Sequence, residues 1–103
     1  MRPDRYDEHT LVQELDALNS LTSLPWQLEE GALTKCFRFS DFREAFAFMT
    51  RVAGIADEMD HHPEWRNIYN RVDIRLSTHD AKGVTELDFK LARVMEAASR
   101  TLN

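Results

Sequence analysis

The order of helices and strands is decided by residues 40–77, which read SDFREAFAFMTRVAGIADEMDHHPEWRNIYNRVDIRLS. Apolar side chains recur at helical spacing through the first half of this stretch, over about five turns. Ser40 and Asp41 stand just before them and supply a cap and a carboxylate for the first turn of a helix. Pro63 restricts the residue before it to extended backbone, so the helix must end near Met59 and a strand must follow.

Two strands are predicted after this proline. Residues 65–69 are rich in side chains that favour strands, and residues 70–71 read as a turn. Val72, Ile74 and Leu76 then alternate strictly with polar neighbours. This alternation predicts a second strand with one buried face and one wet face.

Upstream of this stretch, the pattern predicts a helix and a hairpin. Residues 10–21 carry apolar side chains at spacings of three and four, which is typical of an amphipathic helix. Trp26 and Leu28 alternate with polar neighbours, and residues 33–39 alternate again. A turn containing Gly31 separates these two segments, which are therefore predicted to form the first pair of strands.

Downstream, residues 78–84 read as a loop, and Thr85 with Asp88 resembles a capping box that opens a last helix. The predicted order is αββαββα. Hairpins are the only short connections between neighbouring strands, so the four strands are expected to form an antiparallel sheet. We therefore predict an α+β fold in which the helices pack on one face of that sheet.

The composition indicates one folded domain spanning residues 1–103. Apolar residues make up 43% of the chain and charged residues 30%, a balance that can bury a core. The net charge of −5 provides no attraction to a phosphate backbone, so direct nucleic-acid binding is not expected. Cys36 is the single cysteine, which fits a reducing compartment, and we expect neither a signal peptide nor a membrane span. A cytoplasmic protein is therefore expected.

The apolar side chains also predict how the chain packs. We expect Trp26, Trp65 and Tyr69 to be half-buried strand aromatics. The core line of the central helix is expected to consist of Phe42, Ala45, Phe46, Met49, Val52 and Ala56. Phe48 and Ile55 fall off that line. Because such surplus apolar surface is usually buried against a second copy, we expect a homo-oligomer.

Three of the four histidines are concentrated in one part of the chain. His61, His62 and His79 lie within 19 residues of one another. Carboxylates accompany them at Asp57, Asp60, Asp80 and Asp88. Histidine is the side chain whose ordinary pKa lets it give or take a proton near neutral pH. If the last two strands form a hairpin, His62 and His79 lie toward the same end of it.

Three interpretations of this cluster are open from spacing alone: surface or capping groups, acid–base catalysis, and metal binding by histidine and carboxylate. Neighbouring side chains in extended backbone point to opposite sides, so His61 and His62 cannot easily share one ion. No helical HExxH pair is present either. Asp88 is more simply explained as a helix N-terminal residue, whereas Trp65 can wall a pocket for a flat ligand.

Four segments around the histidines form a signature. They read Asp60-His61-His62-Pro63-Glu64-Trp65, Tyr69-Asn70-Arg71-Val72, Leu76-Ser77-Thr78-His79-Asp80 and Gly83-Val84-Thr85-Glu86-Leu87-Asp88. This signature closely resembles that of the pterin-4a-carbinolamine dehydratases, and the resemblance extends from about Trp26 to the C-terminus. Asp57 occupies a position at which that family has an acidic or basic residue.

The resemblance implies a small α+β enzyme that dehydrates 4a-hydroxytetrahydrobiopterin to the quinonoid dihydropterin and so recycles the tetrahydropterin. It implies no cofactor and no metal. It also implies a homodimer or homotetramer. Animal members of the family additionally bind a transcription factor as dimerisation cofactors, so an interaction module on the same fold is the alternative function.

The resemblance also implies which residues form the site. His61 and His79 are expected to be the acid–base pair, and His62 is expected chiefly to hold the substrate. The substrate-binding set comprises Asp60, His61, His62, Ser77, Thr78, His79 and Asp80. Asp57, Trp65 and Asp88 are expected to line the pocket or to orient other side chains.

Overall fold

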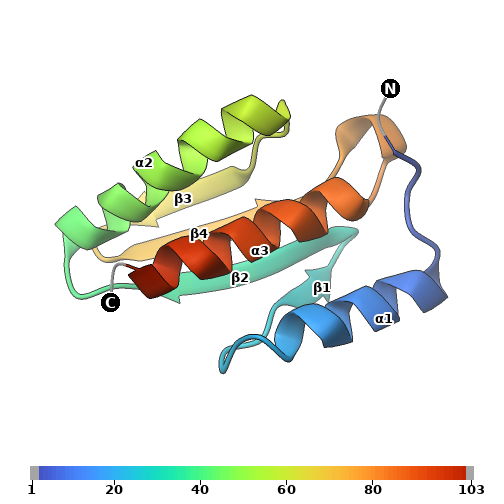
Figure 1. Cartoon of the computed structure of the whole chain (residues 1–103), viewed down its shortest axis with the longest axis horizontal. Coiled ribbons are helices and arrows are strands. Elements are labelled where there is room, and N and C mark those ends of the chain that lie inside the picture. The colour runs from blue at the N-terminus through green and yellow to red at the C-terminus, as the bar shows by residue number, and fades with distance from the viewer. Residues whose placement is uncertain (1–2, 102–103) are drawn as a thin grey trace.

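The computed structural model describes residues 3–101, and its elements follow the predicted order (Figure 1). They are α1 (Glu8–Asn19), β1 (Gln27–Glu29), β2 (Ala32–Arg38), α2 (Phe42–Met59), β3 (Glu64–Ile68), β4 (Arg71–Leu76), the 3-10 turn η1 (His79–Ala81) and α3 (Glu86–Thr101). The four strands form one antiparallel sheet in the order β1-β2-β4-β3. All three helices lie on the same face of it, with α3 between α1 and α2, which confirms the predicted α+β fold (Figure 1).

The termini of α1 and β3 differ from the predicted ones for local reasons. The side chain of Asp7 accepts a hydrogen bond from the Thr10 N–H and caps α1, which therefore begins before residue 10. At the β3–β4 turn, Tyr69 adopts a left-handed backbone with φ of 51°, so β3 ends one residue earlier than expected. The predicted loop at residues 78–84 contains the short turn η1.

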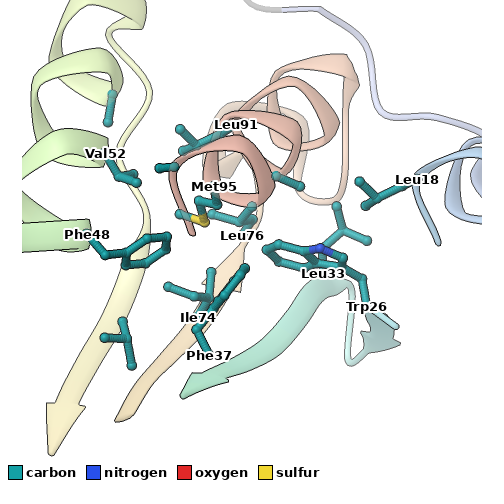
Figure 2. Packing of buried hydrophobic residues seen from close by; sticks show 14 of the residues in the cluster. Leu18, Trp26, Leu33, Phe37, Phe48, Val52, Ile74, Leu76, Leu91 and Met95 are labelled. Atoms are coloured by element: carbon teal, nitrogen blue, oxygen red, sulfur yellow. The ribbon is translucent and has the colours of Figure 1, made fainter. Parts of the chain in front are cut away.

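The apolar core lies between the sheet and the helices. Val72, Ile74 and Leu76 of β4 point into it, as their alternation predicted. Figure 2 shows Ile74 and Leu76 on the side of β4 that faces Leu91 and Met95 of α3. Each fully buried side chain of this size stabilises the fold by about 1.5–3 kcal/mol.

The stripe of α2 that was expected to face the core is wrong: the observed buried stripe is rotated from it by part of a helical turn. Phe48 is fully buried, whereas Phe42 and Phe46 are 47% and 52% exposed. The side chains that α2 buries are Ala45, Phe48, Val52 and Ala56. Their spacing of three and four residues marks a single stripe, and Phe42 and Phe46 lie outside it with their ring centroids 5.6 Å apart.

The three aromatic residues expected to be half-buried lie in three different environments. Trp26 is 1% exposed and Tyr69 is 63% exposed, so the expectation is wrong for both. Trp65 is half-buried and packs against the core. Tyr69 is exposed because it forms the turn rather than the strand, and Trp26 is buried because its indole N–H has a buried partner.

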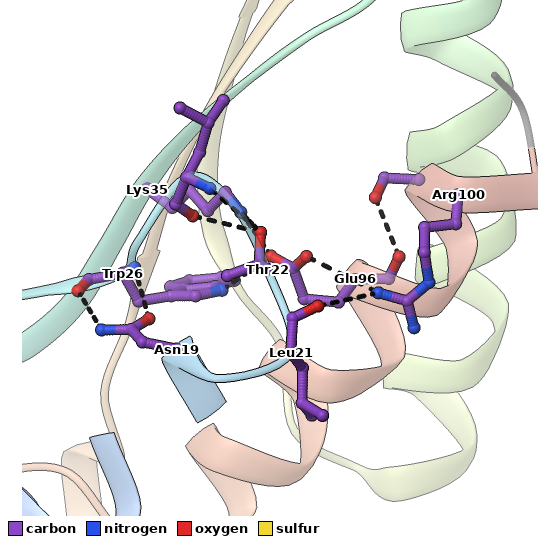
Figure 3. A network of polar contacts seen from close by, with 9 residues as sticks. Asn19, Leu21, Thr22, Trp26, Lys35, Glu96 and Arg100 are labelled. Carbon is purple, nitrogen blue, oxygen red and sulfur yellow. Dashed lines mark hydrogen bonds and ion pairs between the residues drawn. The ribbon is translucent and has the colours of Figure 1, made fainter. Parts of the chain in front are cut away.

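That partner belongs to a polar network between α3, β2 and the segment after α1 (Figure 3). Lys35 Nζ lies 2.5 Å from Glu96 Oε2, and both side chains are almost fully buried. Trp26 Nε1 donates to the same oxygen at 2.9 Å, and Lys35 Nζ also donates to Thr22 Oγ1 at 3.1 Å. The Asn19 side chain bonds both the N–H and the carbonyl of Trp26. The network therefore holds residues 19–26 against the body of the protein.

No helix within the described residues has both the length and the apolar composition that crossing a bilayer requires.

The buried ion pair predicts a large effect of Glu96→Gln. The substitution keeps the side-chain volume but leaves the Lys35 ammonium buried without a counter-charge, which we expect to lower the free energy of unfolding by about 3 kcal/mol. Urea denaturation measures this. Glu14→Gln is the control, because it removes a partly exposed pair with Arg93 and should cost at most about 1 kcal/mol. Equal losses in the two variants would contradict the prediction.

Candidate active site

A pocket of about 240 Å³ lies where α2 and β4 end. Its lining consists of Asp60, His61, His62, Ser77, Thr78, His79 and Asp80. These are the seven residues that the resemblance implies bind substrate. The fold therefore brings together two short segments that the sequence separates.

The strand register explains why these segments meet. β3 and β4 are antiparallel, and Glu64 at the start of β3 pairs with Arg75 near the end of β4. The residues that lead into β3 and the residues that follow β4 therefore share one end of the sheet. Asp60 ends α2 in a left-handed conformation with φ of 52°, and His61 N still bonds the Ala56 carbonyl at 3.0 Å.

His61 is buried and held by a carboxylate. Its side chain is 6% exposed, and Nε2 lies 2.6 Å from Oδ1 of Asp88, which has no exposure at all. An ionised carboxylate only accepts hydrogen bonds, so Nε2 carries the proton toward Asp88. In that tautomer Nδ1 is the ring nitrogen that can accept a proton.

Asp88 is also bonded through its second oxygen. Oδ2 accepts from Thr78 Oγ1 at 2.8 Å and from the Thr85 backbone N–H at 2.9 Å. The two threonine hydroxyls lie 2.8 Å apart, and Thr85 Oγ1 accepts from Leu87 N. The predicted capping box at Thr85 is thus present, and the Asp88 carboxylate that forms it also contacts the pocket residue His61. The buried charge is satisfied on both oxygens.

His62 and His79 lie in a different environment from His61. Their side chains are 60% and 82% exposed. His62 Nε2 lies 3.4 Å from Asp57 Oδ1, and His79 Nε2 lies 3.7 Å from Glu64 Oε1. The imidazoles of His62 and His79 are therefore exposed to solvent, whereas that of His61 forms part of the pocket wall.

The three residues expected to line the pocket or to orient other groups are all outside the lining. Asp88 lies behind His61, and Asp57 lies beside His62. Trp65 pairs with Ile74 in the sheet and does not wall the pocket. Glu64 was not among the predicted site residues, although the β3–β4 register places it near His79.

The chemistry available here is proton transfer. One imidazole is fixed by a buried carboxylate, and two more are solvated within the same pocket. No three histidine, cysteine or acidic side chains in the described part of the chain are placed to hold a metal ion together.

A wider hollow of about 540 Å³ lies elsewhere, on residues of β1, β2 and β4, and contains no histidine. Cys36 and Asp73 lie in it. Partial desolvation and the neighbouring Asp73 carboxylate raise the pKa of the Cys36 thiol. The thiol is therefore a poor nucleophile at neutral pH, and the smaller histidine pocket is the better candidate site.

Known proteins with similar sequences match nearly the whole of this chain. A relative from Sinorhizobium medicae (strain WSM419) is 50% identical over 96% of this chain and 91% of its own length. Another from Rhizobium etli is 50% identical over 99% of both chains. Both carry provisional names as pterin-4-alpha-carbinolamine dehydratases.

Solved structures are similar as well. The crystal structure of a transcriptional coactivator/pterin dehydratase from Brucella melitensis superposes with a TM-score of 0.86 at 46% identity, covering 93% of this chain and 99% of that one. A pterin dehydratase-like RuBisCO assembly factor of the alpha-carboxysome has a TM-score of 0.62 at 23% identity, covering 76% of this chain and 90% of that one, and shares the fold.

The family model described as pterin 4 alpha carbinolamine dehydratase matches residues 5–98. This match spans every element that forms the histidine pocket. The chain therefore belongs to the pterin 4 alpha carbinolamine dehydratase family.

Proposed function

We propose that this protein is a hydro-lyase that converts 4a-hydroxytetrahydrobiopterin to quinonoid 6,7-dihydropterin, the step that precedes reduction in tetrahydropterin recycling. The observation that carries the proposal is the pocket in which the Asp88-bound His61 meets His62 and His79. Membership of the dehydratase family supports the same reaction.

Dehydration requires two proton transfers at one flat bicyclic molecule. The 4a-hydroxyl must be protonated as its bond to carbon breaks and water leaves, and a ring nitrogen must lose a proton. The reaction therefore needs an acid and a base on the same substrate. No electrons enter or leave, so neither a redox cofactor nor a co-substrate is needed.

Different pocket residues transfer the two protons and bind the substrate. We assign the acid and the base to His61 and His79, which come from different segments and can approach the substrate separately. His62, beside Asp57, binds the substrate. Asp60, Ser77, Thr78 and Asp80 complete the lining. Asp88 acts as a positioning residue, because it fixes the ring orientation and tautomer of His61.

The direct experiment is a dehydration assay. A 4a-hydroxytetrahydropterin is generated in situ by an aromatic amino acid hydroxylase, and its decay is followed with and without the purified protein. Accelerated decay that persists in EDTA supports a metal-independent dehydratase. Decay at the uncatalysed rate would contradict the proposal.

His79→Ala tests the first catalytic assignment. His79 is on the surface, so the variant should melt at the wild-type temperature while its dehydration rate falls by about 10²–10⁴. Circular dichroism and the assay separate the two properties. His9→Ala is the matched control, since His9 is an exposed histidine of α1 that lies outside the pocket lining. A His79 variant as active as the His9 control would remove His79 from the mechanism.

Asp88→Asn tests the positioning role. The amide cannot hold His61 as the carboxylate does, so kcat should fall by about 10² or more. Because Asp88 acts through His61, the double variant His61→Ala/Asp88→Asn should be no slower than His61→Ala alone. Steady-state kinetics on the folded fractions measures this cycle. Additive losses would show that Asp88 acts independently of His61.

We also propose that the protein is a homo-oligomer that uses the exposed aromatic face of α2. Phe42 and Phe46 lie outside the core stripe and form an apolar patch on the surface. The same face is available for a protein partner, and the Brucella melitensis relative is described as a transcriptional coactivator as well as a dehydratase. An interaction module is therefore the second candidate function.

Sedimentation tests the oligomer. Wild-type protein at micromolar concentration should sediment as a multiple of 12.0 kDa, and Phe46→Glu should shift it toward the single-chain mass. Val12→Glu is the control, because Val12 is an equally exposed apolar residue on α1. A wild-type species of 12.0 kDa throughout, or equal effects of the two variants, would contradict the proposal.

A further inference from the structure

The segment before α1 lies against the loop that carries His79. We call residues 3–7 the N-terminal strap. Tyr6 N donates to the Val84 carbonyl at 2.9 Å, and Arg5 Nη1 donates to the Lys82 carbonyl at 3.4 Å. Figure 1 shows the strap, in dark blue, passing beside the orange loop before the chain enters α1.

Gly83 lies directly against the side chain of Arg5. A Cβ atom on Gly83 would lie 2.4 Å from Arg5 Cδ and 2.8 Å from Arg5 Cγ. Real Cβ atoms do not approach other carbons so closely, so the aliphatic stem of Arg5 occupies the space that any other residue would need. The Tyr6 ring continues the contact, with its centroid 5.9 Å from that of Phe89 in α3.

The loop beneath the strap is anchored at its two ends by the buried Thr78 and Val84, whereas His79 and Asp80 of η1 between them are exposed. η1 is a single 3-10 turn, and Lys82 ends it in a left-handed conformation with φ of 57°. The loop closes through Thr78 N, which donates to the Gly83 carbonyl at 2.8 Å. The His79 side chain has one ionic neighbour at 3.7 Å and is 82% exposed. Its position is therefore set by the loop backbone rather than by packing of its ring.

We propose that the strap, through Arg5 seated on Gly83, positions the η1 loop and with it His79 for proton transfer. The proposal rests on the proposed dehydratase function and adds a positioning residue far from the histidines in sequence. Thr78 links the strap to the rest of the site, because it pairs with Gly83 through its backbone and with Asp88 through its hydroxyl. Small displacements of a catalytic group lower the rate at which a bound substrate reacts.

Arg5→Ala, Gly83→Ala and the double variant test the proposal. Arg5→Ala removes both close atoms, and Gly83→Ala pushes the Arg5 stem away, so each should lower kcat about five- to tenfold with KM little changed. Both should speed hydrogen exchange of the amides of residues 78–83. Since the two changes break one contact, the double variant should be no slower than the slower single variant.

Gly54→Ala is the matched control, because a Cβ atom at this helical glycine would meet nothing within 4 Å. It should leave kcat and loop exchange unchanged. Faster hydrogen exchange of the loop amides with unchanged kcat would contradict the catalytic part of the proposal, because the strap would then only stabilise the loop. Unchanged hydrogen exchange would overturn the whole proposal. A wild-type protein without dehydratase activity would instead overturn the proposed function, and with it the expected effect of the strap on kcat. Hydrogen exchange of residues 78–83 would still report whether Arg5 holds the loop.

Discussion

Asp88 is a carboxylate with no exposure to solvent, and its two oxygens are bonded to His61, Thr78 and the Thr85 backbone. A charge buried without such partners costs several kcal/mol, so these bonds must form together if the chain is to fold. They join the segment after α2, the segment after β4 and the first turn of α3. The bonds that satisfy this one buried charge thus build the pocket wall and fix its innermost imidazole.

Helix α3 carries a second buried carboxylate, and the two have different tasks. Glu96 lies two turns along the helix from Asp88 and binds Lys35 and Trp26, far from any pocket histidine. Apolar side chains such as Leu91 and Met95 separate the two centres. The N-terminal end of α3 therefore holds His61 in the pocket wall, whereas Glu96 fastens the segment between α1 and β1. Loss of Glu96 should therefore affect stability alone, whereas loss of Asp88 should affect both stability and the pocket.

Residues 40–77 were sufficient to predict α2, β3 and β4, because a long amphipathic helix, a proline and strict alternation leave few arrangements. The same periodicity did not separate Phe46 from Phe48, since both are equally apolar and only the packed sheet decides which one is buried. Thr85 and Asp88 were recognisable as a helix start. Their bonds to Thr78 and His61 were not, because they depend on tertiary contacts across 10 and 27 residues.

The proposed pterin substrate binds between imidazoles that the protein holds in different ways. Nitrogen NMR of the histidine side chains, during titration with a dihydropterin of the product class, tests this binding most directly. We predict that His61, His62 and His79 shift together while His9 does not, and that Nε2 of His61 keeps its proton toward Asp88. Unchanged pocket histidines at saturating pterin, or a His61 whose proton lies on Nδ1, would contradict the account.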